Sequence, residues 1–193
     1  MTADELFSNT AVLMFGAIET SEAMTANALA HLLGSADQLE AVAADRSLVP
    51  DAVEESLRME PAATLVDRYA TGAVDLAGVA ISAGDLVSVS LAGANRDPTV
   101  FAGPDRFDVS RPNLNLQLAF VRGPHTCLGL HLARLQTIAA VNAVLDLVPD
   151  ARLDDDFQPA SGLVFRKPAT VPVTWDPIVE FVSYTHPTLP TIC

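Results

Sequence analysis

The spacing of apolar residues predicts that the chain begins with helices. Across residues 3–33 apolar side chains recur every three or four positions, the period of one helix face, and a glycine follows the last of them. Residues 37–45 indicate a second, short helix. A third is expected from Pro50 to about Glu60, because proline suits the first helical turn and the next residue is again a proline.

Short strands and a long irregular stretch follow these helices. Apolar segments divided by glycines predict strands at 65–70, 74–76 and 79–81. Residues 95–119 carry many proline, asparagine and aspartate residues with no sustained period, and so long a loop in a compact domain usually has a function. Residues 128–147 return to helical spacing, and weak strand signals lie at 163–165 and 171–175. The pattern indicates an α+β chain, mainly α with small β-sheets.

Composition and charge remove several classes of function. Half of the 193 residues are hydrophobic, enough for a core, but the longest apolar run is too short to span a bilayer. The formal net charge of −13 opposes contact with nucleic-acid phosphates or an anionic membrane, so neither is expected as a partner. Two cysteines are too few for a disulfide framework, and no secretory signal is visible. We expect a cytoplasmic protein.

The acidic charge is not spread evenly. Residues 1–60 carry 11 acids and only two arginines, whereas residues 95–135 carry five arginines and three aspartates around Cys127. Arginine supplies 10 of the 11 basic side chains, and its planar fork suits two-point pairing with carboxylates. This basic region is either a set of structural ion pairs or a site for an anionic ligand or partner.

Cys127 lies where a glycine-bearing loop, residues 120–129, runs into a helix. The free N–H groups of a helix start favour a thiolate, and Gly123 and Gly129 leave the backbone open to a flat or bulky group. Such a thiol can be a nucleophile, a redox sensor or a metal ligand, and the plain alternative is an inert buried cysteine.

Two histidines near this cysteine suggest further alternatives. A zinc site of His125, Cys127 and His131 would lack the fourth ligand that a structural site needs. A nucleophile pair of Cys127 and His125 would join residues two apart on a loop, which seldom gives the required geometry.

Two further groups of residues have chemical potential. Glu55 and Arg58 lie three apart on one helix face and can pair, which matters if the pair is buried and joined by arginines of the long loop. In the first helix, Gly16 and Ala17 permit close approach of a ligand, and the carboxylate and hydroxyl of Glu19 and Thr20 suit proton delivery. The alternative is ordinary helix packing with a polar edge.

In their order and separation these motifs closely resemble the cytochrome P450 family of haem-thiolate monooxygenases, in particular its soluble bacterial members. The haem-binding loop F-x-x-G-x-H-x-C-x-G matches Phe120 to Gly129 at every fixed position, and E-x-x-R matches Glu55 and Arg58. The stretch Ala94-Asn95-Arg96-Asp97-Pro98 looks like the start of the family's meander, and Gly16-Ala17-Ile18-Glu19-Thr20 is similar to its motif A-G-x-E-T. The resemblance covers about residues 5–175.

The resemblance implies a role for each matching residue. Cys127 would give its thiolate to the iron of haem b, with Phe120 against the sulfur side of the ring. The other implied haem contacts are His125 and Arg68 at the propionates, with Gly123, Gly129, Gly16 and Ala17 close to the cofactor. Thr20 would hold the oxygen ligand and Glu19 would relay protons. Glu55 and Arg58 would form a buried network with Arg106, or failing that Arg111, which serves folding and haem retention.

The implied reaction inserts one atom of O2 into a small apolar substrate. Electrons would come from a ferredoxin-type donor and its reductase, and Arg122 and Arg134 would meet that acidic donor. Two other hypotheses are a haem-binding module without turnover and an acidic helical scaffold that binds no haem.

The chain also departs from the family pattern. Ala17 and Val121 stand where relatives usually carry glycine, and family members are much longer. We therefore expect residues 1–175 to be the C-terminal part of a single P450 domain whose N-terminal half is absent. Residues 176–193 match nothing in the family, and we expect a disordered or foreign tail.

Overall fold

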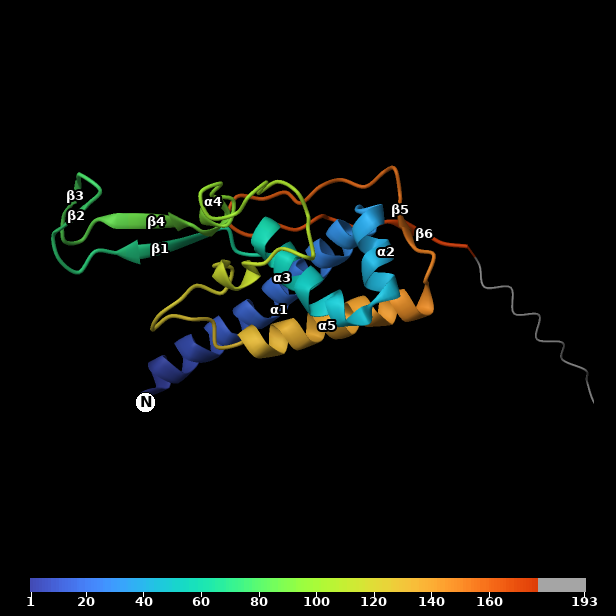
Figure 1. Ribbon diagram of the computed structural model, residues 1–193. Helices are drawn as coiled ribbons and strands as arrows, with labels where there is room; N and C mark the ends of the chain where they lie inside the picture. Colours follow the sequence, from blue (N-terminus) through green and yellow to red (C-terminus); the bar gives the residue numbers. More distant parts are fainter. Residues whose placement is uncertain (177–193) are drawn as a thin grey trace, which may run out of the picture.

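The computed structural model describes residues 1–176, so most of the tail expected at 176–193 lies outside the described residues. Helices make up most of this part (Figure 1): α1 (Ala3–Leu33), α2 (Ala36–Ala44), α3 (Val49–Met59), α4 (Leu91–Ala94) and α5 (Leu130–Leu147), with 3-10 turns η1 (Arg46–Leu48) and η2 (Leu114–Leu116). The strands are β1 (Leu65–Tyr69), β2 (Val74–Leu76), β3 (Val79–Ile81), β4 (Leu86–Ser90), β5 (Arg152–Leu153) and β6 (Val173–Thr174). The expected α+β class, mainly α with small sheets, is confirmed.

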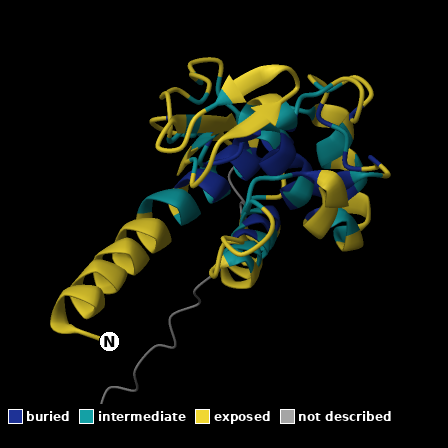
Figure 2. Ribbon diagram, turned by 90° about the vertical axis from the view of Figure 1, so that its left-hand side faces the viewer, coloured by how far each residue is buried: buried dark blue, intermediate teal, exposed yellow. Residues whose placement is uncertain are grey.

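Helix α1 begins and ends at signals present in the sequence. The Thr2 hydroxyl accepts from the amide of Glu5, and the Glu5 carboxylate accepts from the amide of Thr2, which caps the first turn. Gly34 follows the last turn. Only the second half of α1 packs into the body, and its first half extends outward with both polar and apolar side chains exposed (Figure 2).

The core lies where α1, α3 and α5 pack against one another. Helix α3 is strongly amphipathic, and its buried face carries Val49, Val53 and Leu57. These side chains meet Met24 and Leu32 of α1 and the buried residues of α5. Burying one such side chain contributes roughly 1.5–3 kcal/mol, so this three-helix contact stabilises the region that carries the predicted motifs.

The sheets are small two-stranded antiparallel ribbons. Strand β1 pairs with β4, β2 with β3, and β5 with β6. The β1–β4 ribbon projects from the body with β2 and β3 at its tip (Figure 1). The sequence did not predict β4 or β5, and the strand expected at 163–165 is only an isolated bridge between Ala63 and Phe165.

Residues 95–119 form the long loop expected from the sequence, with η2 as its only regular turn in the described structure. Side chains hold it: the Asn95 amide oxygen accepts from the backbone of Leu118 at 2.7 Å, and Asn113 donates to the carbonyl of Val100 at 2.7 Å. Phe101, a residue of this loop, is buried. The stretch is therefore ordered by polar contacts to its own backbone. In residues 1–176 no helix has the length and apolar character needed to cross a membrane.

Candidate functional site

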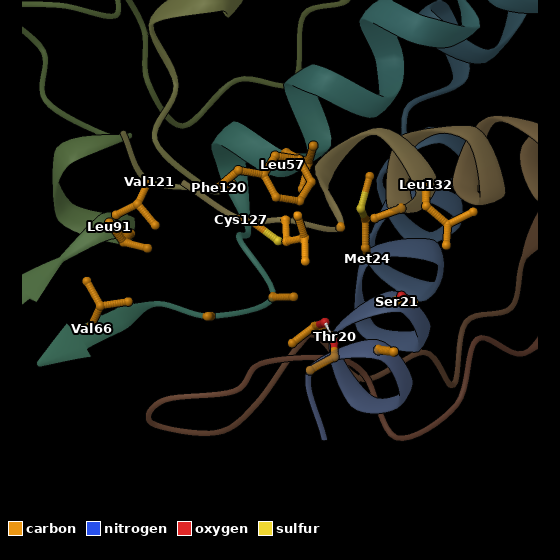
Figure 3. A pocket seen from close by; sticks show the side chains of 18 of the residues that line it. Thr20, Ser21, Met24, Leu57, Val66, Leu91, Phe120, Val121, Cys127 and Leu132 are labelled. Carbon is orange, nitrogen blue, oxygen red and sulfur yellow. Dashed lines mark hydrogen bonds between the residues drawn. The ribbon is translucent and has the colours of Figure 1, made fainter. Parts of the chain in front are cut away.

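A cavity of about 390 Å³ opens between α1, the loop that contains Cys127, and the first turn of α5. Gly16, Ala17 and Thr20 of α1 line it. Phe120 and Cys127 lie across the cavity from Thr20 (Figure 3). Most of the other lining residues are apolar: Val12, Leu13, Met24, Leu57, Ala62, Ala63, Val66, Leu91, Ala119, Val121, Leu128, Leu132 and Ala133. The site is an apolar chamber with one thiol and few polar groups.

The Cys127 loop is closed by its own backbone. The amide of Cys127 donates to the carbonyl of Phe120 at 3.0 Å, and the amide of Thr126 donates to the carbonyl of Gly123 at 3.1 Å. Gly123 has φ +85°, a left-handed conformation that glycine adopts without strain. The thiol of Cys127 is free and exposed, so the alternative of a buried cysteine does not hold for the described residues.

The residue after Phe120 is strained. Val121 has φ +55°, a left-handed value that is unfavourable for a side chain branched at Cβ. Such a conformation costs on the order of 1–3 kcal/mol and persists only when the surrounding structure holds it. Val121 is also the position where the resemblance leads one to expect glycine, so the strain follows directly from this departure.

The α1 side of the cavity brings a hydroxyl and small residues together. The Thr20 hydroxyl donates to the carbonyl of Gly16 one turn earlier, and a Cβ added at Gly16 would meet nothing within 4 Å. Glu19 does not line the cavity. Its carboxylate pairs with Lys167 at 3.0 Å, and Glu22 pairs with the same ammonium at 3.0 Å. The hydrogen bonds that Lys167 donates to Glu19, the larger cause, and to Glu22 raise the pKa of Lys167.

The predicted cofactor contacts do not all gather at the cavity. His125 and Gly129 line it, and Gly123 shapes the loop without lining it. Arg68 lies outside, because it stands on an exposed part of β1 and donates to the carbonyl of Asp67 at 2.7 Å. Val66 lies two positions earlier, on the same face of β1 as Arg68, and it does line the cavity.

The predicted carboxylate–arginine network is present with a different third member. Arg58 donates to Glu55 at 2.7 and 2.9 Å, and both side chains are fully buried. Arg111 adds Nε contacts of 3.1 Å to each oxygen of Glu55. The expectation of Arg106 is wrong, because its side chain is exposed and only its carbonyl faces the network, accepting from Arg58 and Arg111.

His31 is a neighbour of this network that sequence reasoning missed. Its Nδ1 lies 2.9 Å from the hydroxyl of Ser56, and its ring lies against Phe107. Burial, followed by the positive charges of Arg96 and Arg58, lowers the pKa of His31 to about 4. The imidazole is therefore neutral at neutral pH.

The expected partner-facing arginines differ in their surroundings. Arg122 is exposed and donates to the carbonyl of Asn115 at 2.6 Å. Arg134 is partly buried, and its guanidinium group donates to the carboxylate of Glu54 at 2.5 and 3.0 Å. In the described part of the chain, no three His, Cys, Asp or Glu side chains are grouped so that they could hold a metal ion.

Several cavity residues were missed because their signal is only ordinary helix periodicity. Val12 and Leu13 of α1 and Leu132 of α5 lie on faces that the apolar spacing marks as core. Leu65 and Leu163 line a second hollow, near Arg166.

The chain belongs to the cytochrome P450 family. The family model "Cytochrome P450" matches residues 39–147, which include α3, the irregular 95–119 loop, the Cys127 loop and α5. Cytochromes P450 are haem proteins.

Particular relatives agree with this assignment. The chain is 43% identical over 155 residues to the cytochrome P450 monooxygenase PikC of Streptomyces venezuelae, covering 80% of this chain and 37% of that protein. It is 41% identical over 179 residues to vitamin D3 dihydroxylase of Streptomyces griseolus, a match that covers 89% of this chain and 43% of that protein. The solved structure of cytochrome P450 CREJ matches with a TM-score of 0.87 and 36% identity, and the match covers 92% of this chain and 45% of that one. The chain thus spans about two fifths of the length of its curated relatives.

The residues present fit a haem group. A thiol is the donor that ligates iron in this family, and here it is free and lies at an apolar cavity rather than among basic or acidic groups. The small side chains of Gly16 and Ala17 leave the opposite side open for a flat ring. The donor and the open space therefore lie in the same chamber.

Proposed function

We propose that this chain provides the catalytic part of a haem-thiolate monooxygenase. The observation that carries the proposal is a free thiol, Cys127, that shares an apolar cavity with the hydroxyl of Thr20 and the small residues of α1. One atom of O2 enters an apolar organic substrate and the other leaves as water, with electrons from a redox partner and protons from solvent. Haem, when bound, supplies the oxygen activation that the side chains themselves cannot provide.

The chain's own residues have distinct tasks in this proposal. Cys127 would bind the iron of haem b through its sulfur, and the hydrogen bond from its backbone amide to the carbonyl of Phe120 holds the main chain that carries this sulfur. His125 donates to a haem propionate from the rim of the cavity. The apolar lining excludes water from the reacting region.

Thr20 and Glu19 deliver protons in the same proposal. The Thr20 hydroxyl lines the cavity and exchanges its bond to the Gly16 carbonyl for one to a bound water. Glu19 immediately precedes Thr20 and lies at the solvent side, where Lys167 holds its carboxylate. A proton therefore passes from solvent through Glu19 to Thr20.

The electron donor is proposed to be a ferredoxin-type protein with its reductase. The support is electrostatic: residues 95–135 carry a local excess of arginine in an acidic chain, and Arg122 remains exposed among them. The substrate class is proposed only as small and apolar, because the cavity offers few polar groups to orient a polar one.

The ligand assignment is tested by adding hemin, reducing under carbon monoxide, and recording the absorbance band that marks thiolate-ligated haem. We expect the band from the protein completed with the N-terminal part that its relatives carry, and its loss in Cys127→Ser of that protein. Cys193→Ser is the matched control and is expected to keep the band. A Cys127→Ser protein with an unchanged band would refute the assignment.

A second candidate is a haem-binding module without turnover. It is favoured by the share of the relatives that this chain spans, and by the exposure of large apolar residues along the first half of α1. Product formation with a ferredoxin, its reductase and an apolar substrate separates the two. Oxygenated product supports the monooxygenase, and a haem-loaded protein that forms none supports the module.

A further inference from the structure

Glu54 and Arg134 form a polar cluster beneath the Cys127 loop that neither the family motifs nor the proposed chemistry uses. Arg134 of α5 donates to Glu54 of α3 through two nitrogens, at 2.5 and 3.0 Å. The pair is only partly exposed, 30% for the arginine side chain and 20% for the glutamate. A two-point contact with this burial is more restrained than an ordinary surface pair.

The cluster extends into the chain that leads to the loop. Gln117 donates through its side-chain nitrogen to Glu54 at 3.0 Å, and its side-chain oxygen accepts from the amide of Ala119 at 2.6 Å. Glu54 thus holds both α5 and the backbone just before Phe120. We call Glu54, Gln117 and Arg134 the loop anchor.

The anchor also contacts the ring of Phe120. The Arg134 guanidinium carbon lies 4.8 Å from the centre of that ring, within the range of a cation–π contact. The carbonyl of Phe120 accepts from the amide of Cys127. A continuous set of contacts therefore runs from Glu54 through Arg134 and Phe120 to the backbone of the thiol-bearing residue.

Such restraint explains how Val121 keeps its left-handed conformation. Its strain would be released by a shift of the loop unless the residues before it were fixed. Phe120 is the residue immediately before it, and the anchor fixes Phe120 by its ring and by the backbone at Ala119.

We propose that Glu54 and Arg134 are positioning residues for the Cys127 loop, and that their opposite charges tune the environment of the thiolate ligand. The second part rests on the proposed haem-thiolate function, and the first does not. Arg134 lies against the ring of Phe120 and adds positive charge on that side of the loop, while Glu54 offsets it.

Hydrogen exchange of residues 118–128, read by mass spectrometry, tests the positioning role. We expect Glu54→Gln and Arg134→Lys to speed exchange at the amides of Ala119 and Cys127 about tenfold, since each removes one of the restraining contacts. Asp146→Asn is the control, because it removes an ion pair at the other end of α5, where Asp146 meets Arg46. It is expected to leave the loop unchanged.

Protection of α3 and α5 in the same experiment reports whether each variant is folded. If either variant loses that protection, Phe120→Leu is measured in its place, because this substitution removes the Phe120 ring and leaves the Glu54–Arg134 ion pair intact. Accelerated exchange confined to the loop supports the proposal. Unchanged loop exchange in a folded variant overturns it.

The reduction potential of the haem-loaded protein tests the electrostatic role. Glu54→Gln removes a negative charge and is expected to raise the potential, whereas Arg134→Gln removes a positive charge and is expected to lower it. A merely structural role would shift the reduction potentials of the two variants in the same direction, and that result would overturn the electrostatic part of the proposal. Absence of haem from the unaltered protein would defeat the proposed function, while the exchange result would still decide the positioning role.

Discussion

Replacing Arg111 by alanine is expected to lower the free energy of unfolding by about 3–5 kcal/mol, because Glu55 loses one of its two arginine partners and several carbonyls lose a donor, each at about 1–3 kcal/mol when buried. The Arg111 side chain is 5% exposed, and its contacts to Glu55 are made in a fully buried setting. Its other nitrogens donate to the carbonyls of Ala102, Gly103 and Arg106, at 2.7, 3.3 and 3.0 Å. The alanine variant therefore loses the pair and leaves these carbonyls without that donor.

Arg106→Ala is the matched control. The Arg106 side chain is exposed, and its carbonyl, which alone joins the network, survives the substitution. The cost is expected to stay within about 0.5 kcal/mol, as for other exposed positions. Urea unfolding followed by far-ultraviolet circular dichroism measures both variants. Equal losses for Arg106→Ala and Arg111→Ala would refute the assignment of the third network member, as would a loss below about 1 kcal/mol for Arg111→Ala.

Three further predictions concern pH and backbone strain. Because the pKa of His31 is lowered to about 4 on folding, the unfolded chain binds its proton first, so stability falls as pH drops from about 6.5 to 4, by up to ~3 kcal/mol. Urea midpoints across this range measure the slope, and His31→Gln should flatten it; an unchanged slope contradicts the assignment. Val121→Gly relieves the left-handed strain and should raise stability by about 1 kcal/mol, with Val121→Ala gaining less; a loss of stability would count against the strain. Gly162→Ala should cost about 2 kcal/mol or more, because at φ +119° the added Cβ would clash with the carbonyl oxygen of Phe165. Gly72→Ala, where a Cβ meets nothing within 4 Å, is the control for thermal unfolding and should be nearly neutral, so equal effects would disprove the clash.

The regular elements of the fold were largely predictable, because local signals specify them. The capping pattern at Thr2 and the glycine after Leu33 bound α1 where the apolar period begins and ends. Proline at the start of α3 and after its last residues set its limits within one residue. The two-residue strand β5 escapes prediction because it forms only through pairing with β6, about twenty positions further along the chain, where the sequence does carry a strand signal.

The site was predictable as a set of residues but not as an arrangement. Motif spacing gave Cys127, Phe120 and Thr20, which meet at one cavity. The choice between Arg106 and Arg111 depends on how an irregular loop turns, and no sequence period records that turn. The positions of Arg68 and Arg134 depend likewise on which neighbour each side chain meets, a tertiary property.

The 95–119 loop has a practical consequence for handling the protein. Its arginines give trypsin two cleavage positions, after Arg96 and Arg106, because proline follows Arg111. The guanidinium group of Arg96 is bonded to the carbonyl of Met59 and the carboxylate of Asp105, whereas the side chain of Arg106 is exposed. A protease cleaves the transiently opened chain, and this backbone is tied down at Asn95 and Asn113. Digestion there should wait on opening of the surrounding helices, so a segment with little regular secondary structure would survive as long as the core it covers.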